Sequence, residues 1–239
     1  MLHKTQGIVL GVSKYNDRYS ISRIYCRDFG LTSYILPISR SRKSKIKNSL
    51  FFPFSILNME VEHKPLRDIQ RLREVERQYP IYEICSDVTK LYLSFFLSDF
   101  LTRVLRESDN NDITFDFLNN SVETLETAVE GVANFHIAFM IELTRYLGIN
   151  PNRDTEVKNG YFDMLNGEFV NNKPDHSHFL NIEKSAFLMQ LNRINYGNMH
   201  LYKLSRDNRN MIVDYLLEYY RLHLYDFPKL KSLEVLREL

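Results

Sequence analysis

The spacing of apolar residues changes from a period of two to a period of 3.6 near residue 80. Residues 5–63 alternate in short runs such as Thr5–Val12, with turn-rich stretches between them. Such runs at regular spacing predict a small closed or sandwiched β domain. From Ile84 onward the apolar residues recur every three to four positions, which predicts helices that pack as a bundle. We therefore expect an α+β chain, with a β domain at residues 1–80 and a helical domain at residues 81–239.

Two segments do not follow this division. In Pro65–Tyr79, Ile69, Leu72 and Val75 fit helical spacing, but a last β-strand is equally compatible with the residues. Between residues 150 and 181 the chain is rich in Asn and contains two Gly, which predicts a loop-like insertion in the helical domain.

The charges divide in the same place as the apolar pattern. The whole chain has a net charge of +1, but residues 1–80 hold fifteen basic and seven acidic residues, a net charge of +8. The remainder holds sixteen basic and twenty-three acidic residues, a net charge of −7. This asymmetry indicates that the β domain suits a polyanion and that the helical domain suits protein partners.

The densest positive charge lies in Ser39–Leu50, SRSRKSKIKNSL, which has five cations within eight residues and no acid. Clustered Lys and Arg attract phosphates through counterion release, which depends on charge density rather than on exact geometry. A solvated surface loop is the alternative. The five cations are Arg40, Arg42, Lys43, Lys45 and Lys47.

The preceding strand, Tyr19–Arg27, alternates Tyr and Arg on one face. Cations for phosphates and aromatic rings for bases are what single-stranded nucleic acid requires. The alternative is that Tyr25 belongs to the core and that Arg23 pairs with an acid. Together with two cations nearby, the candidate DNA-binding residues are Lys14, Arg18, Arg23, Tyr25, Arg27, Arg40, Arg42, Lys43, Lys45 and Lys47.

The sequence contains no recognisable catalytic motif, and we expect a binding protein rather than an enzyme, without cofactor or metal. Asp99 and Glu142 interrupt apolar helical stripes, but a buried carboxylate with a Tyr or Arg partner is commoner than an acid–base pair. His176 and His178 have no third ligand nearby for zinc. The absence of a long apolar run, of an apolar leader and of paired cysteines favours a cytoplasmic protein without membrane contact.

Four stretches, spread over nearly the whole chain, together resemble the RecO family of bacterial recombination mediators. Thr5–Leu10 is similar to the family's T-x-G-I-V-L start, and Leu50–Phe54 looks like its L-x-P-F stretch. Phe139–Pro151, FMIELTRYLGINP, resembles the F-x-x-x-L-L-x-x-L-G-x-x-P of its helical domain, and Tyr219–Leu233 resembles its Y-x-x-x-H-L…L-K-S close.

The resemblance implies an N-terminal OB-fold barrel and a C-terminal helical bundle. It also implies a nucleoid-associated protein of recombinational repair, which binds single- and double-stranded DNA and anneals single strands. The implied protein partners are RecR and the C-terminal tail of single-stranded DNA-binding protein, from whose DNA the family helps to load the recombinase. An apolar pocket for such a tail needs a cation at its rim, for which Arg145 and Arg206 are the candidates.

The chain departs from the family at the insertion. Many relatives carry a four-cysteine zinc site there, whereas Tyr161–His178 contains no cysteine, so we expect a zinc-free insertion. Phe162, Phe169 and Phe179 are then expected to pack a small hairpin through apolar contacts. Two other functions stay open, an OB-fold RNA-binding protein and a protein scaffold that does not contact nucleic acid.

Overall fold

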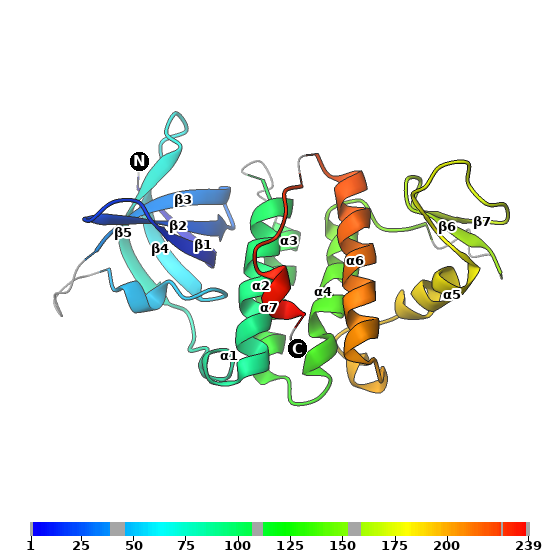
Figure 1. Ribbon diagram of the computed structural model, residues 1–239. Helices are drawn as coiled ribbons and strands as arrows, with labels where there is room; N and C mark the ends of the chain where they lie inside the picture. Colours follow the sequence, from blue (N-terminus) through cyan, green and yellow to red (C-terminus); the bar gives the residue numbers. More distant parts are fainter. Residues whose placement is uncertain (1, 39–45, 107–111, 153–158, 226, 238–239) are drawn as a thin grey trace. The chain divides into compact units, whose positions relative to one another are not determined.

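The computed structural model describes residues 2–38, 46–106, 112–152, 159–225 and 227–237. These residues form two compact units (Figure 1). The first contains residues 2–127 and, from the end of the chain, residues 229–237. The second contains residues 128–228. The first unit therefore joins the whole barrel to the first helices and to the C-terminal segment.

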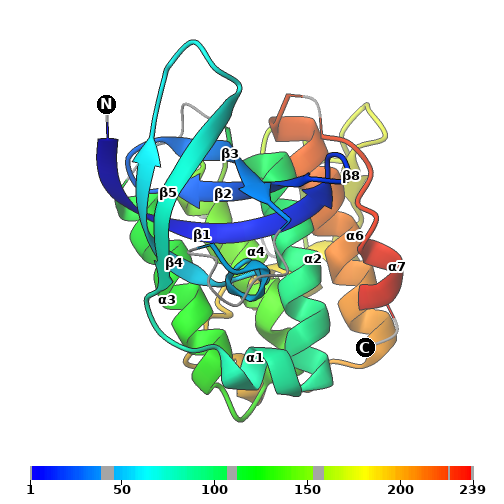
Figure 2. The same ribbon diagram turned by 90° about the vertical axis from the view of Figure 1, so that its left-hand side faces the viewer.

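Five strands of the first unit form a closed barrel in the order β1-β2-β3-β5-β4. All neighbouring pairs are antiparallel except β3 and β5, which run parallel and close the barrel (Figure 2). This confirms the expected OB-like barrel, and β5 shows that the ambiguous segment is a strand. The strands are β1 Leu2–Lys14, β2 Tyr19–Cys26, β3 Gly30–Pro37, β4 Ile56–Glu62 and β5 Ile69–Arg77. A short 3-10 helix, η1 (Asn48–Leu50), precedes β4.

The barrel requires a residue without a side chain at Gly7, the glycine of the T-x-G start. A Cβ atom at Gly7 would lie 2.5 Å from both Ile24 Cγ2 and Met59 Cε, so any side chain there would clash with the core. Ile24 and Met59 belong to a buried apolar cluster that fills the barrel, together with Tyr34 and Leu57. Gly7 therefore allows β1 to lie close to this core.

The helices of the first unit are α1 (Tyr82–Ser86), α2 (Val88–Val104), α3 (Asp112–Thr127) and α7 (Leu233–Leu236). Leu93, Phe96, Leu97, Phe100 and Leu101 of α2 are all buried, as expected for a central helix of a bundle. Among the described residues, no helix combines the length and the apolar character needed to span a membrane.

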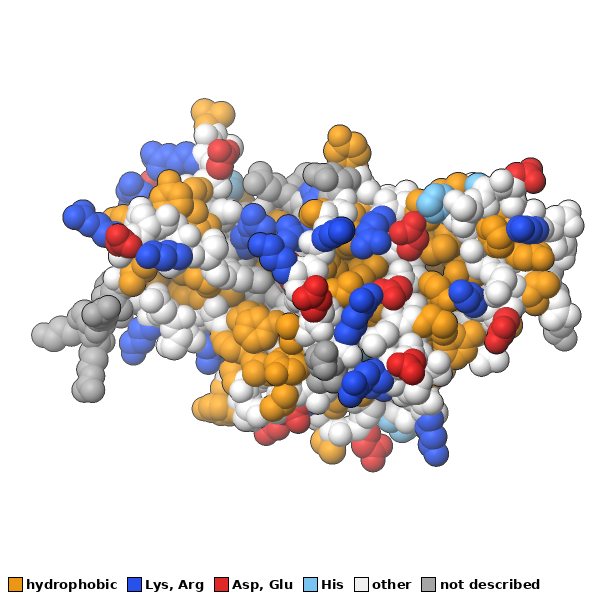
Figure 3. All heavy atoms as spheres, in the orientation of Figure 1, with side chains coloured by type: hydrophobic (Ala, Val, Ile, Leu, Met, Phe, Trp, Pro, Cys, Tyr) orange, Lys and Arg blue, Asp and Glu red, His pale blue; other side chains and the backbone are white. Residues whose placement is uncertain are grey.

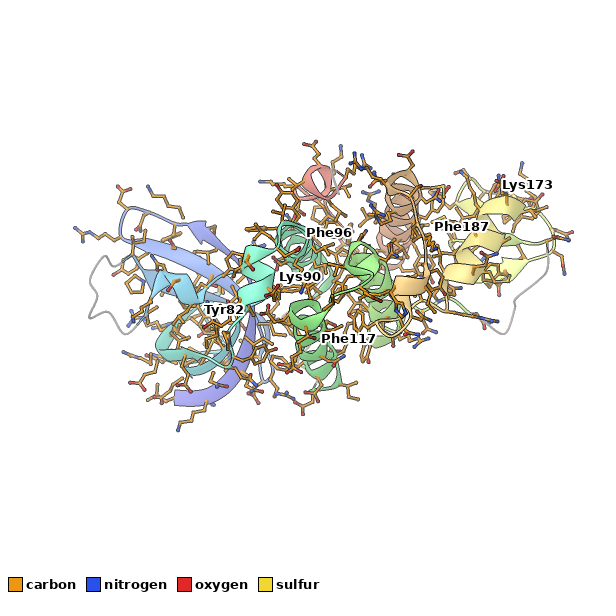
Figure 4. The ribbon with its side chains drawn as sticks, turned by 90° about the horizontal axis from the view of Figure 1, so that it is seen from below. Tyr82, Lys90, Phe96, Phe117, Lys173 and Phe187 are labelled. Carbon is orange, nitrogen blue, oxygen red and sulfur yellow. The ribbon has the colours of Figure 1, made fainter. Side chains whose placement is uncertain are left out.

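Two charged side chains connect the ends of these helices. The Glu126 carboxylate, near the end of α3, accepts hydrogen bonds from the backbone N–H groups of Glu83 and Ile84, both at 2.9 Å. Lys90 Nζ of α2 donates to the carbonyl of Glu126 at 2.8 Å, and Figure 4 labels this buried lysine. Each helix end thus receives the charge that its unpaired backbone groups favour.

The second unit contains the insertion and the remaining helices. Its three short strands form a sheet in the order β7-β6-β8. Phe162 and Phe169 are buried against Tyr219, as expected for an apolar hairpin, whereas Phe179 is only half-buried and makes an edge contact with Tyr161. The elements are η2 Val132–Asn134, α4 Phe135–Tyr146, β6 Tyr161–Asp163, β7 Glu168–Val170, β8 Phe179–Leu180, α5 Ile182–Leu191, η3 Met199–Leu201 and α6 Arg206–His223.

Candidate nucleic-acid interface

The β1–β2 hairpin contacts Ile38, the residue that precedes the basic segment. The Ile38 N–H donates to the Arg18 carbonyl at 2.9 Å, which fixes the hairpin against the residue that follows β3. Arg40, Arg42, Lys43 and Lys45 belong to residues 39–45, which lie outside the described residues. Lys47, just beyond them, is exposed. Ile38, the last described residue before the basic segment, is therefore held to the backbone of Arg18.

We call a group of four exposed side chains in this region the β1–β2 hairpin surface. No ion pair joins Arg18 or Arg23 to another described residue. Lys14 Nζ lies 2.8 Å from Asp17 Oδ1, but both side chains are largely exposed, and such pairs contribute little. Tyr19 faces outward on the same side of β2 as Arg23 and is 40% exposed. The surface consists of Lys14, Arg18, Tyr19 and Arg23.

Helix α3 covers the other end of β2. The Tyr25 ring is fully buried and stacks on Phe115 of α3, with 6.3 Å between the ring centroids. Arg27 lies over the same Phe115 ring and binds two carboxylates, Asp112 at 2.9 Å and Asp116 at 2.6 Å. Tyr25 is buried and not open to DNA, so its predicted binding role needs correction. Arg27 is partly exposed but is held by two carboxylates, and its binding role stays a prediction. Tyr25 lies on the outer face of β2, as the alternation predicts, and Arg27 follows the end of the strand, but Phe115 of α3 packs against both side chains.

The hairpin offers one aromatic residue that the sequence reasoning missed. Tyr15 is 59% exposed in the β1–β2 turn, close in sequence to Lys14 and Arg18. The sequence signal that could have identified it is a Tyr between two cations, Lys14 and Arg18, in a turn-rich stretch. Aromatic rings at such positions can stack on bases of any sequence.

A second region of the barrel is acidic. A hollow of about 740 Å³ beside β1, β4 and β5 is open to solvent, and we call it the glutamate hollow. Its ionisable residues are Glu60, Glu74, Glu76 and Asp28, against Lys4 and Arg27. Because carboxylates outnumber cations, this region disfavours phosphate. The positive charge of residues 1–80 is therefore not spread evenly over the barrel.

The two candidate rim cations of the tail pocket lie at opposite ends of their helices. Arg145 is in the last turn of α4 and pairs with Glu142 at 2.9 Å. Arg206 begins α6, whereas Tyr219, thirteen residues later and about 20 Å along the axis, hydrogen-bonds the Ile149 carbonyl just beyond α4. The structure does not bring Arg145 and Arg206 together.

The second unit also contains a small apolar cavity. It lies among Phe162, Leu188 and Tyr219, and neither candidate arginine lines it. Its volume of about 20 Å³ suits roughly one water molecule, not an aromatic ring. This cavity is therefore not a ready pocket for a phenylalanine.

The carboxylates considered for catalysis have structural partners. Asp99 Oδ2 accepts from the backbone N–H groups of Lys231 and Ser232 and from Ser232 Oγ, at 3.0, 3.2 and 2.9 Å. Its Oδ1 lies 3.2 Å from Arg103. Asp99 thus holds the C-terminal segment against α2.

The two histidines of the insertion also face carboxylates. His176 lies 3.2 Å from Asp163, and His178 lies 3.2 Å from Glu218. Within the described residues, no three His, Cys, Asp or Glu side chains are arranged to hold a metal ion.

Comparisons with known proteins identify the family. The sequence matches the family described as Recombination protein O N terminal over residues 1–79, and Recombination protein O C terminal over residues 85–234. It is 41% identical to the DNA repair protein RecO of Phocaeicola vulgatus, over 100% of this chain and 99% of that protein. It is 40% identical to DNA repair protein RecO of Bacteroides fragilis and 35% identical to that of Porphyromonas gingivalis, again over 100% of this chain and 99% of each relative. The chain therefore belongs to the RecO family of DNA repair proteins.

Proposed function

We propose that this protein binds single-stranded DNA through its barrel, anneals complementary strands and helps to load the recombinase onto strands coated by single-stranded DNA-binding protein. The observation that supports the proposal is the hydrogen bond between the Ile38 N–H and the Arg18 carbonyl, which joins the β1–β2 hairpin to the residue that directly precedes the basic segment in the chain. The exposed cations Arg18 and Arg23 belong to this hairpin, and five further cations follow Ile38 in the sequence.

Annealing follows from charge neutralisation. Two strands repel each other through their phosphates, and cations that contact both lower this repulsion without reading the bases. The exposed rings of Tyr15 and Tyr19 provide sequence-independent stacking. Pairing then releases free energy by itself, so the proposed reaction requires no nucleotide hydrolysis and no catalytic residue.

The DNA-binding residues proposed on this basis are Lys14, Arg18, Arg23, Arg40, Arg42, Lys43, Lys45 and Lys47. The quadruple variant Arg40→Glu, Arg42→Glu, Lys43→Glu, Lys45→Glu reverses four charges in the basic segment. We expect it to lose DNA binding at low salt and to leave the second unit folded. If about four phosphates are contacted, the slope of log K against log salt for the unmodified protein is about −3.

The decisive test is annealing of complementary oligonucleotides coated by single-stranded DNA-binding protein. The unmodified protein should accelerate annealing and the quadruple variant should not. A matched control reverses four exposed cations of the second unit: Lys173, Lys184, Arg193 and Lys203. Equal annealing by the quadruple variant and the unmodified protein would refute the proposal. Stronger competition by RNA than by single-stranded DNA would favour an RNA-binding function instead.

The proposed protein partners are RecR and the tail of single-stranded DNA-binding protein, and the proposed location is the nucleoid. Because Arg145 and Arg206 lie at opposite ends of their helices, only one of them can be at the rim of a given tail pocket. Calorimetric titration of Arg145→Ala and Arg206→Ala with a tail peptide distinguishes them. If neither substitution weakens binding, both assignments are wrong.

A further inference from the structure

A second hollow on the barrel has the opposite character to the glutamate hollow. It has a volume of about 620 Å³, opens to solvent and lies where the β4–β5 hairpin meets the N-terminal part of β1 and the β2–β3 turn. This volume is within the range of about 300–1,000 Å³ that is usual for small-molecule sites. Its lining includes no carboxylate, and we call it the histidine–phenylalanine pocket. The side chains that line the pocket include His3, Phe29, His63, Lys64, Leu66 and Arg67.

Three aromatic rings from three separate stretches of chain meet in this pocket. The Phe29 and His63 rings stack with 4.1 Å between centroids and 9° between planes. His3 meets Phe29 edge-on, with 5.4 Å between centroids. All three side chains are half-buried and all three line the pocket. A stacked group of flat rings open to a hollow is a surface on which another flat ring can stack.

One buried side chain holds the loop that carries the cations. Gln70 is buried, and its Nε2 donates to the carbonyls of Lys64 at 2.9 Å and Arg67 at 2.6 Å. Its Oε1 accepts from the Lys64 N–H at 2.8 Å. One amide therefore connects both ends of the turn, an arrangement that reduces the entropy lost when a ligand binds.

The two cations of the loop, Lys64 and Arg67, differ in how far carboxylates already neutralise them. Lys64 Nζ lies 3.3 Å from Glu62, and hydrogen bonds from Arg73 and Lys64 lower the pKa of Glu62 to about 2. Lys64 is thus partly neutralised. Arg67 is exposed and forms no ion pair with another described residue. Figure 3 shows basic side chains beside this hairpin, the cyan loop of Figure 1.

We propose that the histidine–phenylalanine pocket binds an unpaired DNA base, stacked on the His63–Phe29 rings, with Arg67 on a flanking phosphate. The proposal rests on the proposed function, since it adds a second contact for the same single strand. β1 runs from this pocket at its N-terminal end to the β1–β2 hairpin surface at its other end (Figure 2). A strand bound at both places follows the barrel rather than contacting only its hairpin.

The test compares two oligonucleotides of equal length and charge, one with all its bases and one with abasic sites. His63→Ala should weaken binding of the intact strand about tenfold and leave binding of the abasic strand unchanged, because stacking needs a base. Arg67→Ala should weaken binding of both strands and reduce the salt slope by about 0.7. The matched controls are His200→Ala and Arg193→Ala, exposed residues of the second unit that should change neither affinity.

The outcomes separate this pocket from the proposed function. If the unmodified protein binds the intact strand and His63→Ala binds it equally well, the pocket proposal is wrong and DNA binding by the barrel stands. If His63→Ala weakens both strands equally, stacking is refuted. If the unmodified protein binds neither strand, both proposals fail. Should His63→Ala not fold, as judged by its thermal unfolding, His3→Ala provides the same comparison at the edge of the ring group.

Discussion

The pairing of Arg27 with helix α3 predicts that two acidic residues limit DNA binding by the barrel. Arg27 is 28% exposed and is held by Asp112 and Asp116, whose side chains are 75% and 65% exposed. In the double variant Asp112→Asn, Asp116→Asn, Arg27 loses both charged partners and becomes available to a phosphate. Exposed ion pairs are each worth about 0.2–1 kcal/mol, so the variant should remain folded.

The expected gain in affinity follows from counterion release. One additional phosphate contact on a single strand steepens the salt slope by about 0.7. We take the additional contact to contribute nothing at about 1 M salt. A slope change of about 0.7 then makes the double variant bind about eightfold tighter than the unmodified protein at about 50 mM salt and about threefold tighter at about 200 mM. Fluorescence anisotropy with a labelled oligothymidylate at several salt concentrations measures both the gain and its slope.

Two controls isolate the contribution of Arg27. The variant Asp175→Asn, Asp207→Asn removes the same net charge from exposed positions of the second unit and should give little gain. Adding Arg27→Met to the double variant should abolish most of the gain. A gain that persists without Arg27, or no gain at about 50 mM salt, would show that the carboxylates do not restrain this arginine.

Three further predictions concern polar side chains that stabilise the two units. Asp99→Ala should lower the free energy of unfolding by about 2 kcal/mol and expose residues 229–237 to protease, because three donors lose a charged acceptor; unchanged proteolysis would contradict this. Lys90→Met should cost about 1–2 kcal/mol in urea unfolding, since the Glu126 carbonyl loses its donor, and Lys173→Met is the exposed control. Burial opposes ionisation of Asp163, but hydrogen bonds from Asn166 outweigh it and lower the pKa of the carboxyl. The ionised carboxylate therefore stabilises the folded protein above the unfolded pKa of about 3.9, and this stabilisation is lost as pH falls through the folded pKa. Asp163→Asn should accordingly flatten the pH dependence of stability below about pH 4, and an unchanged acid-unfolding profile would refute the assignment.

The alternation of apolar residues was sufficient to predict most of the barrel, and β5 shows why one strand was ambiguous. Glu60 pairs with Glu74 and Val61 pairs with Leu72, so Arg73 is an extra residue in a β-bulge. In a regular strand every second residue faces the core. Because of the bulge, the core-facing residues Leu72 and Val75 are three positions apart. That spacing imitates a helix in the sequence, and only the pairing with β4 resolves it.

The candidate site was less accessible to sequence reasoning, because its limits come from segments distant in the chain. Tyr25 lies on the outer face of β2, as its alternation predicts, but Phe115 packs over it from α3. Nothing in the spacing of Tyr19–Arg27 distinguishes a solvent-facing position from one that a later helix covers. The histidine–phenylalanine pocket likewise combines His3, Phe29 and His63, which no local pattern connects.

The division of charge between residues 1–80 and the rest therefore overstates the surface that the barrel offers to DNA. Asp112 and Asp116 belong to the acidic stretch, yet they pack in the same compact unit as the barrel and neutralise Arg27. Acids of the barrel itself occupy the glutamate hollow. Phosphate contacts need cations without a competing carboxylate. Among the described residues of the barrel, exposed cations that form no ion pair with a described carboxylate include Arg18, Arg23, Lys47, Arg67 and Arg71. If the barrel binds DNA as proposed, the acidic residues of α3 restrict where on the barrel a single strand can bind.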